Sequence, residues 1–586
     1  MMKARLFFVL SWIIIFQLLS SSVIGQNNEK LIEGRAVWAS PTGIAYNDSV
    51  LQNFIAHCKR AHINLIVLLV KYTDKQVYYH SKQFPESVAE QFRDYDPLAA
   101  VIREAHKAGI RVHAWLCDFT ASPDGPIMKE HPEWAARNPD GKIPSEVEML
   151  GGGRRYFLNW MCPARRPGYT DQWLLPMIEE IVANYDVDGI HHDYVRYPGD
   201  VAPDGYCFCD YCLEDMIKYA HFYYETFPQK RFDITPTLPN FIANWWSDPT
   251  VKPGGWDTWD RRRKAEYLLK GSFIQSGPTD LDYFFYTYRT DAIKRFVRQA
   301  WERASAIKPD IEMSAAVFKN PIASGRFIGQ RWTDFAPWID IMMPMVYRSH
   351  FPPLDYDTFL KQLEEYARYE TRWANGKVHL SIGLDVHYIF NEERLFISEG
   401  LAALDSLKQA TSDHKAMLIQ KMQDSYSVVK DHLGQVAPEL EKTLTTLLAN
   451  FKGDENQTTQ LRSLLQRLQK DPPNDYYPKE KLRRAIETVR RAGAKGIVIF
   501  NARGLTDRKL WPVLEEMFAE PSIDPNLVSS VAEMSIINLK KMQAEISSLK
   551  KKNYLLLIST VVLFVGLVFT IWRKQSTRES SNHKRH

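Results

Sequence analysis

Short apolar runs alternate with amphipathic segments along most of this chain. Eight runs rich in β-branched or other apolar residues predict strands, at 34–39, 63–70, 110–116, 187–194, 311–317, 339–346, 378–385 and 495–500. Between them, apolar residues recur at helical spacing, for example over 97–108, 171–184, 291–307 and 479–492. Eight strands alternating with helices predict an α/β fold, a (β/α)8 TIM barrel.

Two segments are too long to be simple connections within such a barrel. Residues 199–288 follow the fourth strand and are rich in Trp, Pro and Gly, so we expect them to cover the catalytic face. Residues 391–478 follow the seventh strand and show polar amphipathic helices, which predicts a helical insertion. The barrel itself is therefore expected at 31–390 and 479–518.

The two ends of the chain indicate export and membrane attachment. Residues 1–25 combine early basic residues with an apolar run and small residues, as in a signal peptide. Residues 553–572 are apolar and long enough for a transmembrane helix, preceded by a helical stalk at 519–552 and followed by a basic tail at 573–586. We expect a single-pass protein whose catalytic domain is extracytoplasmic, periplasmic or extracellular.

Composition excludes one class of partner. The formal net charge is +4 on 586 residues, with no long basic stripe, so nucleic acid is not an expected partner. Aromatic residues make up 12% of the chain, which suits stacking on sugars as well as core packing.

The richest cluster of chemistry lies in DGIHHDYVRYP, at 188–198. An apolar strand runs directly into titratable and aromatic side chains there. Because the C-terminal ends of barrel strands open onto the catalytic face, we expect a sugar-sized pocket lined by Asp193, Tyr194, Arg196 and Tyr197.

Three blocks of sequence resemble the glycoside hydrolase-like family ten, a group of barrel proteins related to glycan-cleaving enzymes. They are DPLAAVIREAHKAGIRVHAW at 96–115, HPEW at 131–134, and FLNWMCPARRPGYTDQWLLPMIEEIVANYDVDGIHHDYVRYP at 157–198. Weaker similarity continues through YRTDAIKRFV, IDIMMPMVY and LSIGL. The resemblance implies a barrel, an exported location and hydrolysis of a glycosidic bond. The chain departs from the family's usual residues at Cys117, Asp118, Met345 and Asp385.

Glycoside hydrolysis normally uses two carboxyl groups on either side of the scissile bond. Asp193 is the first candidate, as nucleophile or as the carboxylate that stabilises the transition state; the alternative is a buried structural Asp paired with Arg196 or with a backbone amide. Asp385 and Asp118, both at strand ends, are preferred over Asp74 as the second carboxyl, although each also fits a structural cap.

Other side chains are candidates for contacting substrate. His113 and His191 are expected in the pocket, whereas His192 faces the other side of its strand and is expected to pack against helices. Aromatic candidates for stacking on a sugar, or alternatively for core packing, are Trp38, Trp115, Trp160, Tyr197 and Tyr347. No ligand spacing indicates a catalytic metal, and the predicted chemistry needs no cofactor.

Four cysteines are expected to converge near the fourth strand: Cys162, Cys207, Cys209 and Cys212. The last three form CxCxxC, which fits either a structural zinc site or disulfides. An extracytoplasmic location favours disulfides, with the pairing left open.

These observations predict a membrane-anchored extracytoplasmic glycoside hydrolase that acts on a glycan, such as a cell-envelope polysaccharide, with the helical insertion available to a protein partner. One alternative is a catalytically inactive glycan-binding barrel that acts as a membrane-tethered interaction protein. A metal-dependent deacetylase would need a His and Asp ligand cluster that the spacing does not indicate.

Overall fold

The structure is a computed structural model that describes most of the chain. The described residues are 31–148, 155–199, 205–226, 255–270, 280–321, 323–351, 354, 356–386, 392–407, 410–470 and 479–527. Described residues up to Asp524 belong to one compact unit. The predicted signal peptide, most of the stalk, the apolar segment 553–572 and the basic tail lie outside the described residues.

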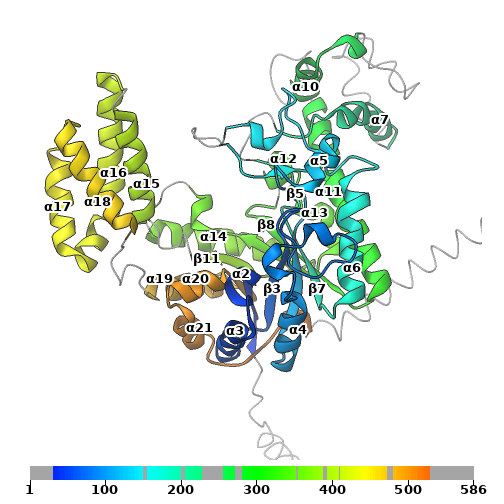
Figure 1. Cartoon of the computed structure of the whole chain (residues 1–586), viewed down its shortest axis with the longest axis horizontal. Helices are drawn as coiled ribbons and strands as arrows, with labels where there is room; N and C mark the ends of the chain where they lie inside the picture. The colour runs from blue at the N-terminus through cyan, green and yellow to red at the C-terminus, as the bar shows by residue number, and fades with distance from the viewer. Residues whose placement is uncertain are drawn as a thin grey trace, which may run out of the picture. The chain divides into compact units, whose positions relative to one another are not determined.

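A closed sheet of parallel strands forms the centre of the fold (Figure 1). Neighbours around the barrel follow chain order, and the last strand pairs again with the first. The strands are β2 (Gly34–Ala39), β3 (Leu65–Lys71), β4 (Arg111–Cys117), β7 (Gly189–Asp193), β8 (Glu312–Phe318), β9 (Ile341–Met345), β10 (His379–Leu380) with β11 (Ile382–Asp385), and β12 (Gly496–Phe500). They coincide with the eight apolar runs, so the predicted barrel is confirmed.

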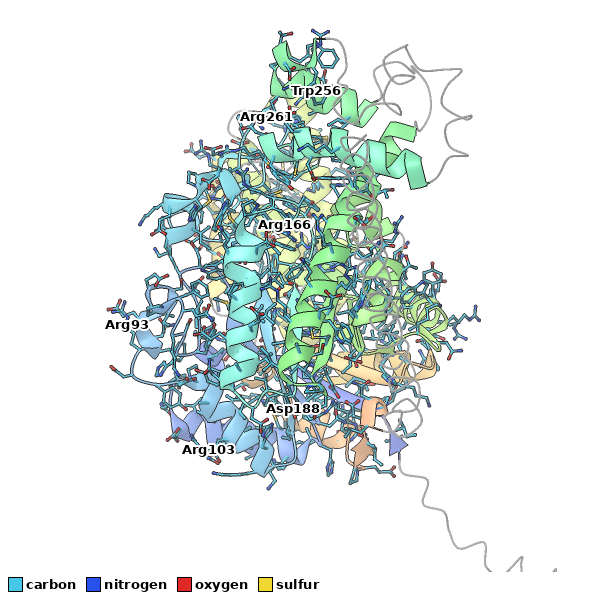
Figure 2. All side chains as sticks on the ribbon, turned by 90° about the vertical axis from the view of Figure 1, so that its right-hand side faces the viewer. Arg93, Arg103, Arg166, Asp188, Trp256 and Arg261 are labelled. Carbon is cyan, nitrogen blue, oxygen red and sulfur yellow. The ribbon has the colours of Figure 1, made fainter. Side chains whose placement is uncertain are left out.

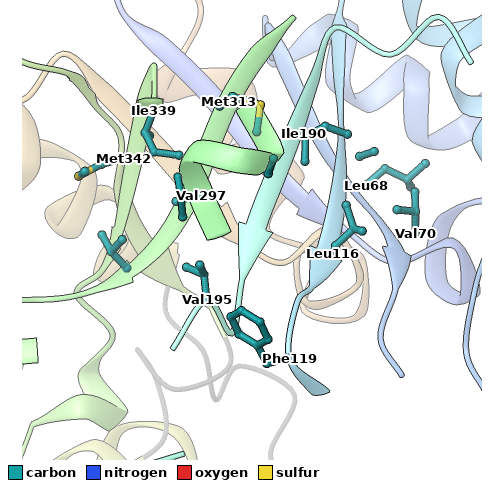
Figure 3. Packing of buried hydrophobic residues seen from close by; sticks show 14 of the residues in the cluster. Leu68, Val70, Leu116, Phe119, Ile190, Val195, Val297, Met313, Ile339 and Met342 are labelled. Atoms are coloured by element: carbon teal, nitrogen blue, oxygen red, sulfur yellow. The ribbon is translucent and has the colours of Figure 1, made fainter. Parts of the chain in front are cut away.

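Each strand position is followed by a helix. These helices are α3 (Asp48–Arg60), α4 (Pro97–Lys107), α6 (Leu175–Asn184), α11 (Asp280–Ile307), α13 (Trp332–Phe335), α14 (Tyr356–Ala374), α19 (Lys479–Arg491) and α21 (Trp511–Met517). Apolar side chains on the outer face of the strands pack beneath them, as Figure 3 shows for Val297 of α11 near Ile190 and Met313. Both faces of each strand are therefore buried, which is why parallel strands read as continuous apolar runs.

Short elements complete the barrel. Two small pairings are β1 (Leu31–Ile32) with β13 (Ser522–Ile523), and β5 (Thr120–Ala121) with β6 (Asn159–Trp160). The short helices are α2 (Pro41–Ile44), α5 (Pro126–Glu130), α12 (Ala323–Ile328) and α20 (Ala502–Asp507).

The connection after β7 contains α7 (Asp210–Thr226) and α10 (Arg261–Lys270). Figure 2 shows Asp188, which precedes β7, toward one end of the molecule and Trp256 and Arg261 at the other. This connection therefore lies on the side of the barrel where the strands end.

Four helices occupy most of the stretch between β11 and α19. They are α15 (Glu392–Ser406), α16 (Ser412–Val436), α17 (Pro438–Ala449) and α18 (Glu455–Lys470). Their apolar faces form a core of their own, which includes Phe396, Met422, Leu444 and Leu465. Among the described helices, none is long and apolar enough to cross a membrane.

Candidate active site

Asp193 is the last residue of β7, and its side chain lies on the interior face of the barrel. The indole N–H of Trp115 donates a hydrogen bond to Oδ2 at 3.1 Å, and the backbone N–H of Tyr194 donates to Oδ1 at 2.7 Å. Burial raises the pKa of this carboxyl to about 6, although both hydrogen bonds and nearby Arg196 act to lower it. A carboxyl that holds a proton at mildly acidic pH can act as a general acid.

The backbone beside Asp193 is held in an unusual conformation. Tyr194 has a φ of 51°, in the left-handed region that costs a non-glycine residue roughly 1–2 kcal/mol. In this conformation its N–H points back to the carboxylate of Asp193. Strain that directs a donor at a buried carboxyl is typical of a functional site.

Asp385 ends β11 and faces the same interior. Two residues earlier, a Cβ added to Gly383 would lie 3.3 Å from Trp38 and 3.2 Å from Tyr347, so this side of the strand points inward. Burial raises the pKa of Tyr347, and the carboxylates of Asp385 and then Asp193 raise it further. Tyr347 is therefore close enough to both carboxyl groups to respond to each.

Asp118, expected to share this space, lies on the other side of the barrel wall. Its Oδ2 accepts a hydrogen bond from Nδ1 of His192 at 2.9 Å, and both side chains are fully buried. The His192 ring packs edge-on against Phe296 of α11 at 5.3 Å, as strand alternation predicts for that histidine. Cys117 is the inward-facing residue at this level, so Asp118 points away from the interior. Asp74, the third alternative, accepts the N–H of Ile127 at the start of α5 at 2.9 Å.

His113 and His191 are fully buried within a hydrogen-bonded chain, which is not the pocket-lining position expected for them. Trp38 Nε1–H donates to His191 Nε2 at 3.1 Å, and His191 Nδ1 and His113 Nδ1 each lie 2.8 Å from Ser314 Oγ. His113 Nε2 is 2.9 Å from Glu312. One assignment satisfies every atom: His191 donates to Ser314, Ser314 donates to His113, and His113 donates to Glu312. Burial lowers the pKa of His191 well below its usual value, consistent with this neutral form.

Arg196 is enclosed by aromatic rings next to Asp193. Its guanidinium lies 4.9 Å from the ring centres of Tyr194 and Phe318 and 5.3 Å from that of Trp160. Trp160 also donates its indole N–H to the backbone carbonyl of Arg196 at 3.1 Å. The rings fix the cation where it lowers the pKa of Asp193.

An aromatic run that the sequence did not reveal continues from this enclosure to the surface. Tyr156 packs against Trp160 at 5.3 Å and stacks on Phe157 at 5.1 Å, and Phe157 is 58% exposed. Tyr72, which follows β3, is also near Asp193, because the Asp193 carboxylate contributes to the raised pKa of that phenol. The only sequence signal for Phe157 is its place beside Trp160 in FLNW.

The remaining aromatic candidates are buried, as are Trp115 and Trp160. Trp38 and Tyr347 pack with Phe500 in the interior layer, with Tyr347 stacked on Phe500 at 5.6 Å. Tyr197, expected in the pocket, is fully buried beside Gly329 and Arg289, so it does not line the barrel interior. Trp245 and Trp246, in the Trp-rich connection after the fourth strand, lie outside the described residues.

Among the described residues, the group that could hold a metal ion is the expected cysteine cluster. Cys162, Cys207, Cys209 and Cys212 are all buried, with sulfur atoms within 4.8 Å of one another. No disulfide joins any of the six cysteines of the chain.

Comparisons with known proteins find sequence similarity to proteins named as glycosyl hydrolases. Glycosyl hydrolase YngK of Bacillus subtilis is 26% identical over 182 residues, 28% of this chain and 32% of that protein. Glycosyl hydrolase DigH of Escherichia coli O6:H1 is 25% identical over 228 residues, 34% of this chain and 49% of that protein. The matched region thus spans about a third of the first relative and about half of the second.

The glycoside hydrolase domain of PgaB (BpsB) from Bordetella bronchiseptica superposes with a TM-score of 0.47 at 12% identity, covering 83% of this chain and 99% of that one. The family described as Glycosyl hydrolase-like 10 matches residues 33–394, more than half of the sequence. This chain belongs to the glycosyl hydrolase-like 10 family.

Proposed function

We propose that this protein is a glycoside hydrolase in which Asp193 donates a proton to the glycosidic oxygen and Asp385 is the second carboxyl. The observation that carries the proposal is the buried Asp193 carboxyl, with its pKa raised to about 6 by burial, on the interior face that Asp385 shares. Two carboxyl groups in unlike environments are what acid-catalysed glycoside cleavage requires.

The reaction follows from these positions. Protonated Asp193 transfers its proton to the leaving oxygen as the glycosidic bond breaks. Ionised Asp385 then either attacks the anomeric carbon or removes a proton from the attacking water, giving retention or inversion. In retention, Asp193 takes a proton from the water that cleaves the glycosyl ester of Asp385, which restores both groups. In inversion, proton exchange with solvent returns the proton from Asp385 to Asp193, and in neither case does a cofactor take part.

The aromatic run joins one exposed ring, on which a sugar unit binds, to the candidate site through the buried rings of Tyr156 and Trp160. Phe157 presents an exposed ring, and Tyr156, Trp160 and Tyr194 continue toward Asp193. Pyranose rings present apolar C–H faces that pack on such rings, which supports an oligomeric or polymeric substrate.

The proposed location follows from the sequence ends. A signal peptide at 1–25 and a transmembrane helix at 553–572 would hold the barrel outside the cytoplasm. A cell-envelope polysaccharide, such as peptidoglycan, is the proposed substrate class in that setting.

The test is release of reducing ends from a panel of cell-wall and storage glycans by the full chain. Asp193→Asn and Asp385→Asn are expected to lose release, while Asp118→Asn retains it in protein shown to be folded by thermal melting. If no glycan is cleaved but one binds equally to wild type and Asp193→Asn, the inactive glycan-binding barrel is the better account. Activity lost in Asp118→Asn but kept in Asp385→Asn would reverse our choice of the second carboxyl.

A further inference from the structure

The cysteine cluster has the geometry of a metal site. Sulfur atoms of Cys162 and Cys212 are 3.3 Å apart, those of Cys162 and Cys209 are 3.8 Å apart, and all four lie within 4.8 Å of one another. A zinc ion with Zn–S bonds of 2.3 Å places its four sulfurs at the corners of a tetrahedron with edges of about 3.8 Å. Each of the four residues is at most 2% exposed.

The surroundings also suit thiolates. The backbone N–H groups of Arg137 and Cys209 donate to Cys207 Sγ at 3.3 and 3.4 Å, and such donors orient and stabilise metal-bound sulfur. A pocket next to Cys209 is lined by the side chains Pro132, Glu133, Arg137, Arg165, Asp210 and Arg261. Its three guanidinium groups outnumber its two carboxylates, which favours the net negative charge of zinc bound by four thiolates.

Disulfides explain this arrangement less well. A disulfide brings two sulfurs to 2.05 Å and leaves the other two as a separate pair. Here one sulfur, that of Cys162, is close to two partners at once, and all four converge on one point. Four sulfur atoms gathered in this way suit one bound metal ion better than two separate disulfides.

We propose that Cys162, Cys207, Cys209 and Cys212 bind one structural zinc ion. Binding displaces the four thiol protons, and the four ligands leave no coordination position for substrate, so the ion has no catalytic role. Nothing in this proposal depends on the proposed hydrolase activity.

The ion would join two segments that both border the candidate active site. Cys162 follows β6, two residues after Trp160, while Cys207 and Cys209 precede α7 and Cys212 lies in its first turn. Burial raises the pKa of Tyr197, and Cys162, Cys212 and Cys207 contribute further, so this residue lies against the cluster. Tyr197 is four residues beyond Asp193, and the zinc would therefore brace the chain that leaves the end of β7.

Metal analysis of the full chain, purified without chelators, is the first test. We expect one zinc ion per chain by inductively coupled plasma mass spectrometry, and an intact mass with all cysteines reduced. A protein without zinc whose mass lacks the four hydrogens of two disulfides would overturn the proposal, and so would stoichiometric iron in place of zinc.

Matched variants locate the site. Cys212→Ala and Cys162→Ala are expected to lose the zinc, whereas Cys58→Ala, which removes a buried thiol on α3, retains it. Equal zinc in Cys212→Ala and Cys58→Ala would place the metal elsewhere and refute the assignment.

Wild-type protein provides a measurement that does not depend on how the variants fold. A strong chelator should lower the Tm by about 5–10 °C, and added zinc should restore it. Cobalt added to the chelated protein should give the intense visible bands of tetrahedral tetrathiolate cobalt. An unchanged Tm together with weak, octahedral cobalt bands would refute a four-sulfur site.

Discussion

Asp193 and Asp118 lie side by side in the fold, but their side chains face opposite sides of the barrel wall. Their strands pair directly, with Cys117 opposite Asp193, and the backbone N–H of Asp118 donates to the backbone carbonyl of Asp193 at 2.7 Å. Burial raises the pKa of both carboxyl groups. Yet Asp193 faces the barrel interior, where it accepts hydrogen bonds from two neutral donors and lies near Arg196, whereas Asp118 faces His192 behind the wall.

The difference arises from strand alternation. Successive side chains point to opposite faces, so one residue of displacement moves a carboxyl from the interior to the layer beneath the helices. The raised pKa therefore marks Asp193 as a candidate proton donor, whereas the raised pKa of Asp118 belongs to a buried structural pair. A shifted pKa identifies a catalytic group only together with the direction in which it points.

Removing the interior carboxyl should have the largest effect on activity. Asp193→Asn keeps the shape of the side chain but cannot supply the proton, so kcat/KM for the cleaved glycan should fall about 10²–10⁴-fold. Steady-state rates on that glycan provide the measurement. A loss of less than tenfold would show that Asp193 is not the acid.

Removing the outer carboxyl should affect stability instead. Asp118→Ala leaves His192 buried without its partner, which should cost about 3–5 kcal/mol of unfolding free energy. Chemical denaturation measures it, and Asp124→Ala is the control, because its pair with Lys75 is exposed. If both variants unfold at the same denaturant concentration as wild type, the buried pair has no structural role.

The carboxyl group of Asp193 should also lower the free energy of unfolding at neutral pH. Its folded pKa of about 6 exceeds the ordinary 3.8, so its contribution to stability is complete below pH 3.8 and is lost as pH rises through 6. Asp193→Asn removes this titration, so the stability of the variant relative to wild type should rise by about 2 kcal/mol between pH 4 and pH 8. Chemical denaturation of both proteins at the two pH values tests this, and a difference that does not change with pH would show that Asp193 does not titrate in this range.

The hydrogen bond from Trp115 should help to set the pH above which activity falls, the alkaline limb of the pH profile. Asp193 acts while protonated, so kcat/KM should fall tenfold per pH unit above about 6. Trp115→Phe removes a donor to the ionised form, and the limb should move up by about one pH unit. A limb that stays in place or moves down would exclude Asp193 as its source.

The sequence predicted the barrel more fully than the site. The eight strands were recognisable because strands buried on both faces are continuously apolar. The orientation of Asp118 could also have been predicted from the sequence, because counting alternate residues from Trp115 places Cys117 inward and Asp118 outward. His113 lies near the start of its strand, so it could likewise have been predicted to lie away from the strand ends that form the candidate site. Phe157, by contrast, is linked to the site through its neighbour Tyr156, because Tyr156 packs on Trp160 and Trp160 packs on Tyr194 at the end of β7, a tertiary contact that no local pattern encodes.

Substitution of Phe157 tests whether the aromatic run lets the interior site bind glycan at the protein surface. The buried pair of Asp118 and His192 has no such connection to the surface. Phe157→Ala removes an exposed ring without touching the carboxyl groups, so KM for a long glycan should rise about 3–10-fold with kcat unchanged. Met417→Ala is the matched control, because Met417 is also 58% exposed but lies on α16. An oligosaccharide too short to reach Phe157 should show no change in KM. Equal KM values for the long glycan in both variants would limit recognition to the enclosure around Arg196.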